Sequence, residues 1–392
     1  MKSIFPHPIY LGAATRSPIG KFGGALKRFS APELAALTLK EALKRSTHQE
    51  APDYVILGHA RQAGCGPNPA RQALIKAGLS NEIPALTINQ ACASGMASIV
   101  GAAEKISLGK ARSIWAGGVE SMSNTPYLLP QVRWGHRMGH AEVVDGMHKD
   151  GFFCPLAEML MGGTVEEFIV KEQKISRQDQ DDYAFQSQVK ANRAWSEGLY
   201  KDEIFEIFAE GKNPGLATDE HRRIDIERGS LDKLSPVFDA KNGSVTAGNS
   251  SGITDGAAFV EVSNRLAAHS QVELIDFECT ALDPKKMGMG PVPSIKKILA
   301  RQSLSVNDIQ IFEINEAFAG QVLACQRALQ IPSNKLNPRG SSIAIGHPIG
   351  CTGTRITVSA IHQIKKLDGA LAIASLCVSG GMGLSILIRG LK

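Results

Sequence analysis

The sequence lacks the marks of a disordered, fibrous or nucleic-acid-binding protein. Only 21% of its 392 residues are charged, and 43 basic against 38 acidic side chains leave a dispersed formal charge of +5. That excess is too small to indicate a nucleic-acid partner, although it tolerates an anionic ligand. A hydrophobic content of 43%, with 39 glycines spread along the chain, excludes disordered, collagen-like and coiled-coil classes. The length predicts about two to three domains.

Cysteine is sparse, and its spacing matches no zinc site. The seven cysteines form no C-x-x-C pair, and His347 with Cys351 supplies two ligands at most. An apolar signal-peptide core is also missing, so we expect reduced thiols, a cytoplasmic location and no metal. Residues 369–388 carry no charge, but glycines split them into two short β-branched runs. We expect buried strands joined by a turn there, and no membrane contact.

Strand-like runs alternate with helical patterns toward both ends of the chain. The early pattern comprises a helix from the Ser30–Glu33 capping box to about residue 44, a strand at 54–57, a helix at 70–77, a strand at 85–89, a small-residue helix after residue 92 and a strand at 113–116. Strand-like runs resume at 257–262, 272–277 and 309–314. This alternation predicts an α/β protein, with helices packed on the faces of mostly parallel sheets.

The middle of the chain differs from both ends in composition and in its pattern of predicted elements. Residues 121–241 are rich in Met and His, contain a long polar helix after Ser176 and show few strand signals, so we interpret them as an inserted lobe. We expect three parts, namely 1–120 with 242–270, the lobe 121–241, and 271–392. Segments 88–118 and 343–381 each read as strand, glycine turn, helix, basic residue, strand and Gly-Gly, which fits either an internal duplication or two similar βαβ units.

Four places in the α/β parts could carry chemistry. Cys92 stands at the start of a helix, where unpaired backbone N–H groups favour thiolate. His347 lies in a glycine-rich turn, Cys377 ends a strand before a turn at Ser379, and Asn315 follows the strand 309–314. Each of these residues alone fits a structural role better than a catalytic one. Together they offer a nucleophile with a base, a second acid or base, and donors for an oxyanion.

The blocks around these residues resemble those of the thiolase family, and of its acetyl-CoA acetyltransferases in particular. The matching blocks are NQACASGMAS at 89–98, GGVESMSN at 117–124, VTAGNSSGITDGAA at 245–258, NEAFA at 315–319, GHPIGCTGTR at 346–355 and CVSGGMG at 377–383. They cover essentially the whole chain in the family's order. The resemblance implies a thiolase-like fold with two related αβα halves forming a five-layered core, an inserted loop lobe that holds coenzyme A, and a homodimer or homotetramer.

By the same resemblance, the chain would condense two acetyl-CoA to acetoacetyl-CoA and CoA, or thiolyse a 3-ketoacyl-CoA. Cys92 would carry the acyl group, His347 would activate it, and Cys377 would act as acid or base. The backbone N–H groups of Cys92 and Ser379 would bind one oxyanion, and His347 with a water on Asn315 would bind the enolate. CoA thioesters would be substrates, with no cofactor. All these groups should converge on one pocket at the mouth of two stacked sheets.

Further positions match coenzyme A contacts of the family, namely Met161, Arg223, Ala247, Ser251, Ala317 and Phe318. The chain departs from the family at two places. Ser379 stands where many members have glycine, although its backbone N–H is retained. Leu160 stands where short-chain members often have histidine, so a 3-ketoacyl-CoA thiolase of broader chain length stays open beside an acetoacetyl-CoA enzyme.

The sequence leaves two other functions to weigh against a thiolase. Residues 248–252 fit the G-x-S-x-G elbow of serine hydrolases, with Asp255 and His347 following in a permissible order. The preceding strand is short, however, and the residues after the elbow look like a strand instead of the required helix. A non-catalytic acyl-CoA or lipid binder would share the fold, but it would have no chemical need for the four reactive positions.

Overall fold

The computed structural model describes residues 2–48, 50–212 and 214–391. Its main sheet has the strand order β12-β13-β14-β11-β1-β10-β5-β3-β4, with β2 beside β10. The strands of this sheet are β1 (Ile9–Arg16), β2 (Gly20–Lys21), β3 (Tyr54–His59), β4 (Ala85–Ile88), β5 (Ser113–Ser121), β10 (Thr254–Ser263), β11 (Ser270–Ala281), β12 (Ile311–Ile314), β13 (Leu371–Val378) and β14 (Met382–Gly390).

The sheet differs from the expectation in two respects. β1 pairs antiparallel with both β10 and β11, so the strands of the two halves form one continuous sheet and not two separate stacked ones. Most neighbours are antiparallel, and only β3–β4, β3–β5 and β12–β13 are parallel. The turn between β13 and β14 shows the reason, since a connection of residues 379–381 is too short for a parallel crossover.

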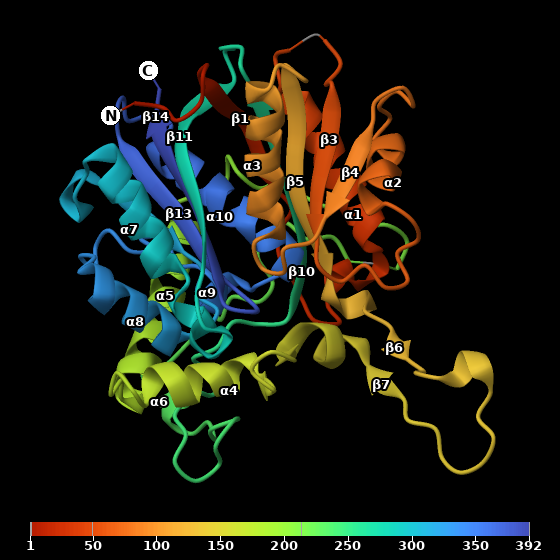
Figure 1. Cartoon of the computed structure of the whole chain (residues 1–392), viewed down its shortest axis with the longest axis vertical. Helices are drawn as coiled ribbons and strands as arrows, with labels where there is room; N and C mark the ends of the chain where they lie inside the picture. The colour runs from red at the N-terminus through yellow and green to blue at the C-terminus, as the bar shows by residue number, and fades with distance from the viewer. Residues whose placement is uncertain (1, 49, 213, 392) are drawn as a thin grey trace.

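Helices make three layers around the two halves of this sheet (Figure 1). The principal helices are α1 (Ala31–Arg45), α2 (Pro69–Lys76), α3 (Ser94–Ser107), α7 (Pro291–Gln302), α8 (Ala319–Leu329) and α10 (Ile349–Ile364). α1 and α2 cover the outer face of the N-terminal half, and α7 and α8 cover that of the C-terminal half. α3 and α10 lie between the halves, and their apolar side chains join both in one core. The result is the five-layered core that was expected.

The two central helices cross in close contact because glycines face each other at the crossing. A Cβ on Gly353 of α10 would lie 2.3 Å from the backbone nitrogen of Met96 in α3. A Cβ on Gly95 would lie 2.7 Å from Thr354 Oγ1. This close approach brings the residues just before both helices, Cys92 and His347, to the same end of the core.

The two segments suspected of duplication have equivalent helices and strands but differ at their start. Each central helix leads to a strand, α3 to β5 and α10 to β13. Residues 343–345, expected as a strand, instead belong to the helical turn α9 (Ser342–Ile345). The backbone N–H groups of Ala344 and Ile345 bond to Ser341 O at 3.0 Å, so the segment pairs with itself. A short apolar run does not distinguish a strand from a buried helical turn.

Residues between β5 and β10 form the lobe. Its elements are the hairpins β6–β7 (Tyr127–Leu128, Val144–Asp145) and β8–β9 (Phe153–Cys154, Met159–Leu160), and the helices α4 (Met161–Val165), α5 (Arg177–Ser196) and α6 (Arg228–Asp232). Of these, α4, α6 and the β6–β7 hairpin lie below the core in Figure 1, while α5 lies beside α8 and α9. The long polar helix after Ser176 is confirmed as α5, with a capping box between Ser176 and Asp179. The boundaries of the three predicted parts stay a prediction.

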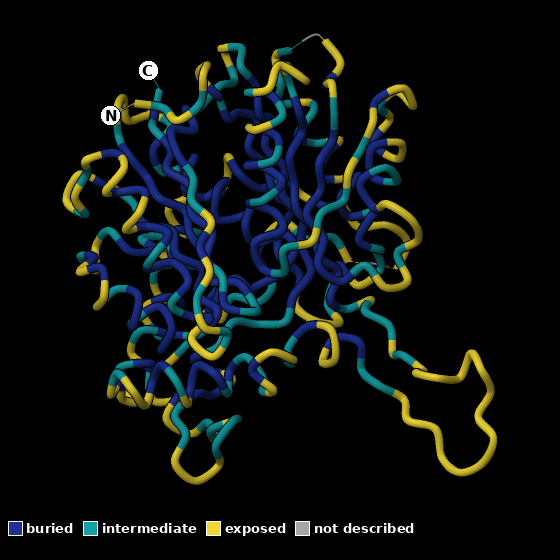
Figure 2. Tube along the Cα trace, viewed as in Figure 1, coloured by how far each residue is buried: buried dark blue, intermediate teal, exposed yellow. Residues whose placement is uncertain are grey.

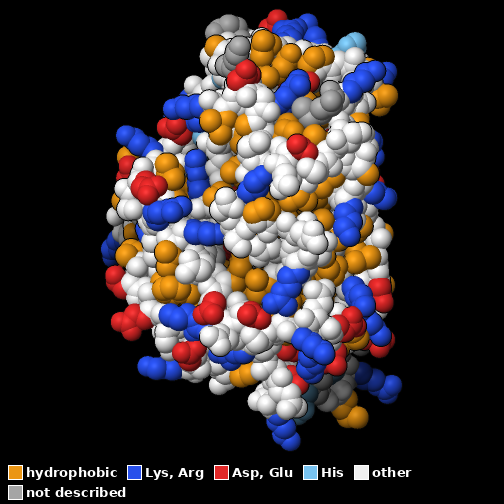
Figure 3. Space-filling model, turned by 90° about the vertical axis from the view of Figure 1, so that its left-hand side faces the viewer, with side chains coloured by type: hydrophobic (Ala, Val, Ile, Leu, Met, Phe, Trp, Pro, Cys, Tyr) orange, Lys and Arg blue, Asp and Glu red, His pale blue; other side chains and the backbone are white. Residues whose placement is uncertain are grey.

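The surface is mixed in charge, and the core strands are buried (Figure 2). Acidic and basic side chains are interspersed over the face shown in Figure 3. None of the described helices combines the length and the apolar character needed to cross a bilayer.

Candidate active site

One cavity of about 350 Å³ brings together four of the five residues predicted to carry chemistry. Cys92 comes from the turn between β4 and α3, His347 from the turn before α10, Cys377 from β13 and Ser379 from the following turn. Asn315 does not line the cavity but stands behind His347, with its Nδ2 3.5 Å from His347 Nε2. Convergence of the two sulfurs, the imidazole and the carboxamide is therefore observed.

Cys92 is buried, and two backbone N–H groups bond toward its sulfur. They belong to Ser379 and to Cys92 itself, the two donors predicted for an oxyanion. Burial nonetheless raises the pKa of the Cys92 thiol, because it outweighs the opposing charge of Arg61 and these two N–H groups. The expectation that the position favours thiolate is thus wrong for the free protein. The cysteine is a thiol at rest and needs a base to ionise it.

His347 is held in the form that can serve as this base. Thr352 Oγ1 donates to Pro348 O at 2.9 Å, so at 2.6 Å it accepts the proton of His347 Nδ1. Nε2 is therefore the unprotonated ring nitrogen, and its lone pair faces Asn315 Nδ2 across the long contact of 3.5 Å. Burial, together with the charges of Arg355 and Arg61, lowers the pKa of His347 to about 3, which keeps the ring neutral near pH 7.

The Asn315 amide is oriented by a buried chain of donors. Arg355 Nη2 donates to Ser342 Oγ, and Ser342 Oγ donates in turn to Asn315 Oδ1. With its oxygen occupied, the amide presents Nδ2 to His347. Ser342, Thr352 and Arg355 were not predicted as functional residues, although the block at 346–355 contains two of them.

Of the two cysteines in the cavity, Cys377 holds its proton more strongly. Burial raises the pKa of its thiol well above the ordinary value, and the neighbouring Cys92 and Cys325 add to the shift. Cys377 therefore enters any reaction as a proton donor. Once it has given up its proton, it becomes a strong base.

Most predicted coenzyme A contacts line the same cavity, namely Met161, Ala247, Ser251, Ala317 and Phe318. Leu160 and Met287 also line it. Arg223 does not. It is exposed, and its backbone N–H donates to Gln188 Oε1 at 3.0 Å while its carbonyl accepts from Asn192. The roles of all six residues toward coenzyme A stay predictions.

No pattern in the sequence indicated several of the residues that line the cavity. His148, Gly151 and Phe152 belong to a π-helical turn of the lobe at His148–Phe152, and Phe238 comes from a loop much later in the chain. Such turns are often found at functional sites. Only the fold brings these residues beside Cys92, because the lobe has no periodic pattern that would place them.

Glu120, at the end of β5, connects the residues after β3 and the first turn of α10 to the sheet. Its carboxylate accepts the backbone N–H groups of Ala60, Arg61 and Gly350, and lies 3.1 Å from His59 Nε2. Burial acts to raise the pKa of Glu120, but His59, Arg61 and the Gly350 N–H lower it overall. The ionised carboxylate thus fixes the first turn of α10, directly after His347.

The hydrogen bonds of Ser250, Asp255 and His347 exclude a serine-hydrolase catalytic triad. Ser250 lines the cavity, but its Oγ donates to Thr246 O at 2.6 Å. Asp255 accepts from the backbone N–H and the hydroxyl of Ser123, and His347 Nδ1 bonds to Thr352. No described bond joins the serine, the histidine and the aspartate.

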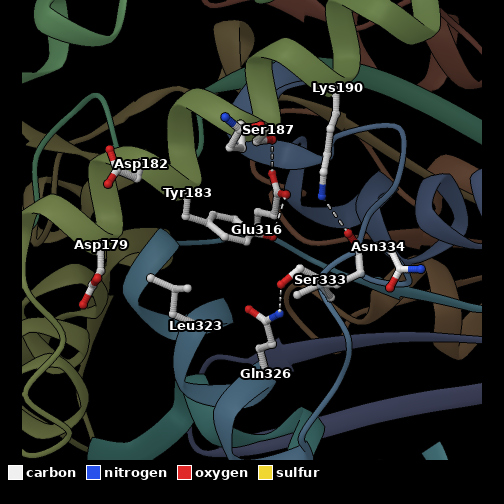
Figure 4. Close-up of a pocket in the computed structure, with 12 residues that line it drawn as sticks. Asp179, Asp182, Tyr183, Ser187, Lys190, Glu316, Leu323, Gln326, Ser333 and Asn334 are labelled. Atoms are coloured by element: carbon white, nitrogen blue, oxygen red, sulfur yellow. Dashed lines mark hydrogen bonds between the residues drawn. The ribbon is translucent and has the colours of Figure 1, made fainter. Parts of the chain in front are cut away.

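A second cavity of about 440 Å³ lies between α5, α8 and residues 333–336 (Figure 4). The buried Glu316 points into this region, where it accepts from Tyr183 Oη, Ser187 Oγ and Asn337 Nδ2. Its carboxylate is therefore fully used in joining α5 to the loop after β12. We assign this cavity a structural role.

Among the described residues, one group has the composition of a metal site. It consists of His48, Glu261 and His269, and it lies apart from the catalytic cavity. The Thr47 backbone N–H donates to His269 Nδ1 at 3.0 Å, so the ring's proton is on Nε2, which donates to Glu261 at 2.8 Å. Serine hydroxyls occupy the same carboxylate, so the group is complete as a hydrogen-bonded cluster.

Comparisons with known proteins agree with this geometry. The chain matches the family models for the thiolase N-terminal domain at residues 9–265 and the thiolase C-terminal domain at residues 268–390. An acetyl-CoA acetyltransferase of Cupriavidus necator is 42% identical over 390 residues, or 97% of this chain and 99% of that protein. The Bacillus anthracis acetyl-CoA acetyltransferase structure has a TM-score of 0.92 at 42% identity, covering 98% of this chain and 99% of that one. Human mitochondrial 3-ketoacyl-CoA thiolase in complex with CoA has a TM-score of 0.93 at 36% identity, covering 98% of each. The chain therefore belongs to the thiolase family and is an acyltransferase enzyme.

Proposed function

We propose that the protein condenses two acetyl-CoA to acetoacetyl-CoA and CoA, reversibly, through an S-acetyl Cys92. The observation that carries the proposal is the meeting of Cys92, a neutral His347 and a protonated Cys377 in one cavity. A thiol and a neutral base facing the same cavity are the groups that acyl transfer through cysteine requires. The names of the relatives from C. necator and B. anthracis support the acetyl group as the acyl unit.

In the first half of the reaction, His347 Nε2 takes the proton of Cys92. The thiolate attacks the thioester carbonyl, and the N–H groups of Cys92 and Ser379 hold the oxyanion that forms. When the intermediate collapses, the bond to the CoA sulfur breaks and Cys377 gives its proton to that sulfur. Cys92 is then acetylated, Cys377 is a thiolate and His347 is an imidazolium.

In the second half, the Cys377 thiolate takes a proton from the methyl group of another acetyl-CoA. The imidazolium of His347 and a water on Asn315 stabilise the enolate oxygen, and the enolate carbon attacks the acetyl carbonyl on Cys92. The Cys92 thiolate leaves and recovers its proton from His347. The Cys92 proton returns from His347, and the Cys377 proton that left with CoA is replaced by one from the acetyl-CoA methyl group, so the enzyme is restored without a cofactor.

A second candidate is thiolysis of longer 3-ketoacyl-CoA substrates, which the apolar character of the cavity wall favours. Phe152, Leu160, Phe238 and Met287 all line it, and no histidine stands at position 160. The name of the human relative points the same way. Comparing kcat/KM on acetoacetyl-CoA with that on a 3-ketoacyl-CoA of medium chain length separates the two candidates.

We also propose a homodimer or homotetramer and a cytoplasmic location. The location is supported by the cysteines, which are all free thiols, as is usual in reducing compartments. Support for the oligomer comes from the exposed arm of the lobe, whose test is given in the Discussion.

The acyl-enzyme tests the proposed chemistry directly. After incubation with acetyl-CoA, mass spectrometry should locate an acetyl group on Cys92 in the wild type and in Cys377→Ala. Cys377→Ala should fail to exchange the methyl protons of acetyl-CoA for deuterium, because its base is missing. An unmodified Cys92 in a protein that binds acetyl-CoA would support the non-catalytic binder, and normal exchange by Cys377→Ala would remove that cysteine from its role.

A further inference from the structure

Arg61 is a buried cation without a partner beside the catalytic cavity. It follows the end of β3 and is only 7% exposed. Its Nε is buried without a hydrogen bond, and within the described part of the chain the guanidinium forms no ion pair. Burying an unpaired charge costs several kcal/mol, so a buried cation without a partner calls for an explanation.

The guanidinium lies directly behind the cavity wall. It packs against Gly151, where an added Cβ would meet Nη2 at 2.2 Å, Nε at 2.5 Å and Cζ at 2.6 Å. Gly151 lines the cavity together with Cys92 and His347. Only a glycine, with no side chain, leaves room for the guanidinium at this depth.

Glu120, a buried carboxylate that accepts the backbone N–H of Arg61, is already occupied. Three backbone N–H groups bond to its oxygens, and His59 Nε2 lies 3.1 Å away. Arg61 contributes its own backbone N–H to this set, but not its side chain. The positive charge is therefore not neutralised by a direct contact, and it acts on the groups of the cavity. It favours the ionised form of the Cys92 thiol and the neutral form of His347.

We propose that Arg61 is a positioning residue whose fixed charge stabilises the Cys92 thiolate without touching the substrate. The anion that pairs with it electrostatically is then the transient thiolate formed when His347 removes the proton, and this explains why no permanent partner is present. The proposal rests on the proposed function of Cys92 as nucleophile and adds the group that sets its reactivity. A fixed cation near a buried cysteine is a general way to increase its thiolate fraction.

The experiment measures the alkylation of Cys92 by iodoacetamide in the absence of CoA compounds. Rates are followed from pH 5 to 10 by mass spectrometry of the Cys92 peptide, which separates it from the other cysteines. The variants are Arg61→Met, which removes the charge at similar length, and Arg61→Lys, which keeps the charge. Arg71→Met is the matched control, since Arg71 on α2 donates only to the carbonyls of Asn81 and Ile83.

We expect Arg61→Met to raise the apparent pKa of Cys92 alkylation by about one unit, with about a tenfold lower rate at pH 7. Arg61→Lys should restore most of the wild-type profile, and Arg71→Met should leave it unchanged. Arg61→Met should unfold at a temperature no lower than the wild type, because it removes an unpaired buried charge. A merely structural arginine would show the opposite pattern, with lower stability and an unaltered profile.

A wild-type pH profile in Arg61→Met would overturn the inference. If that variant does not fold, Arg61→Gln, which keeps a polar side chain, repeats the measurement with the same two outcomes. Failure of the proposed function is distinguishable, because it appears as absent acetylation of Cys92 in the wild type. The alkylation profile does not depend on turnover and tests Arg61 in either case.

Discussion

The protonation states of the site are decided residue by residue through specific partners. His347 is a base because Thr352 accepts its Nδ1 proton and because burial beside two guanidinium groups disfavours the imidazolium. Cys377 keeps its proton at rest because burial disfavours its thiolate and raises its pKa. The motif blocks could predict which residues take part. They could not predict these states, which depend on depth of burial and on partners from other segments.

Glu313 on β12 offers a test of burial at the residue scale. Gln363 Nε2 donates to its Oε1 at 2.6 Å, while Oε2 has no hydrogen bond among the described residues. Burial raises the pKa of Glu313 to about 7, although Gln363 and Arg355 oppose the shift. Between the unfolded pKa of 4.5 and this value, the unfolded chain releases a proton that the folded chain keeps. The free energy of unfolding should therefore fall as pH rises through this window, by on the order of 3 kcal/mol.

The substitution Glu313→Gln should remove this loss of unfolding free energy at higher pH. We expect the variant to match the wild type near pH 4.5 and to exceed it in stability at pH 8, as measured by urea unfolding at both values. The exposed substitution Glu142→Gln serves as control and should follow the wild type. Identical pH dependence of Glu313→Gln and the wild type would show that Glu313 is already ionised in the folded protein.

At the scale of elements, the position of Cys92 relative to His347 depends on the crossing of α3 and α10. Helix boundaries with capping boxes were predictable, since Ser30 and Ser176 both start the helices that their patterns indicated. The crossing was not predictable, because it arises from contacts between glycines far apart in the sequence. The same limit explains the helical turn at 343–345, where a tertiary setting and not the apolar pattern decides the conformation.

Gly353→Ala tests this crossing. The new Cβ would lie 2.3 Å from Met96 N, so the helices must separate. We expect a loss of about 1–3 kcal/mol in the free energy of unfolding, together with slower acetylation of Cys92. Gly101→Ala in α3 is the matched control, since its Cβ meets no atom within 4 Å, and it should stabilise the protein by about 0.5–1 kcal/mol. Equal effects of the two substitutions would contradict the proposed role of the crossing.

At the scale of the whole molecule, one part of the lobe extends away from the body as an arm. It joins β6 to β7, and Figures 1 and 2 show it projecting and exposed. Trp134 is 88% and Met138 90% exposed at its surface. Large apolar side chains on a projecting segment are typical of a surface that another chain covers. We expect a second copy of this chain to cover it, consistent with the proposed homo-oligomer.

The double substitution Trp134→Glu with Met138→Glu should lower the assembly state, because charges would be buried at the contact. Sedimentation velocity at micromolar concentration measures the change. Phe208→Glu is the control, since Phe208 is 73% exposed on a different loop and should leave the assembly state unaltered. A wild-type protein that sediments as a monomer would contradict the expectation.

The sequence by itself determined the family, the α/β class and the residues of the catalytic motifs, because each of these is carried by short local patterns of residue types. Only the tertiary structure decided that β1 joins the two halves into one sheet, that His148 lines the cavity with Arg61 behind its wall, and that the Cys92 thiol is neutral at rest. These features depend on contacts between distant segments and on the energy of burying charge. Local patterns along the chain contain neither.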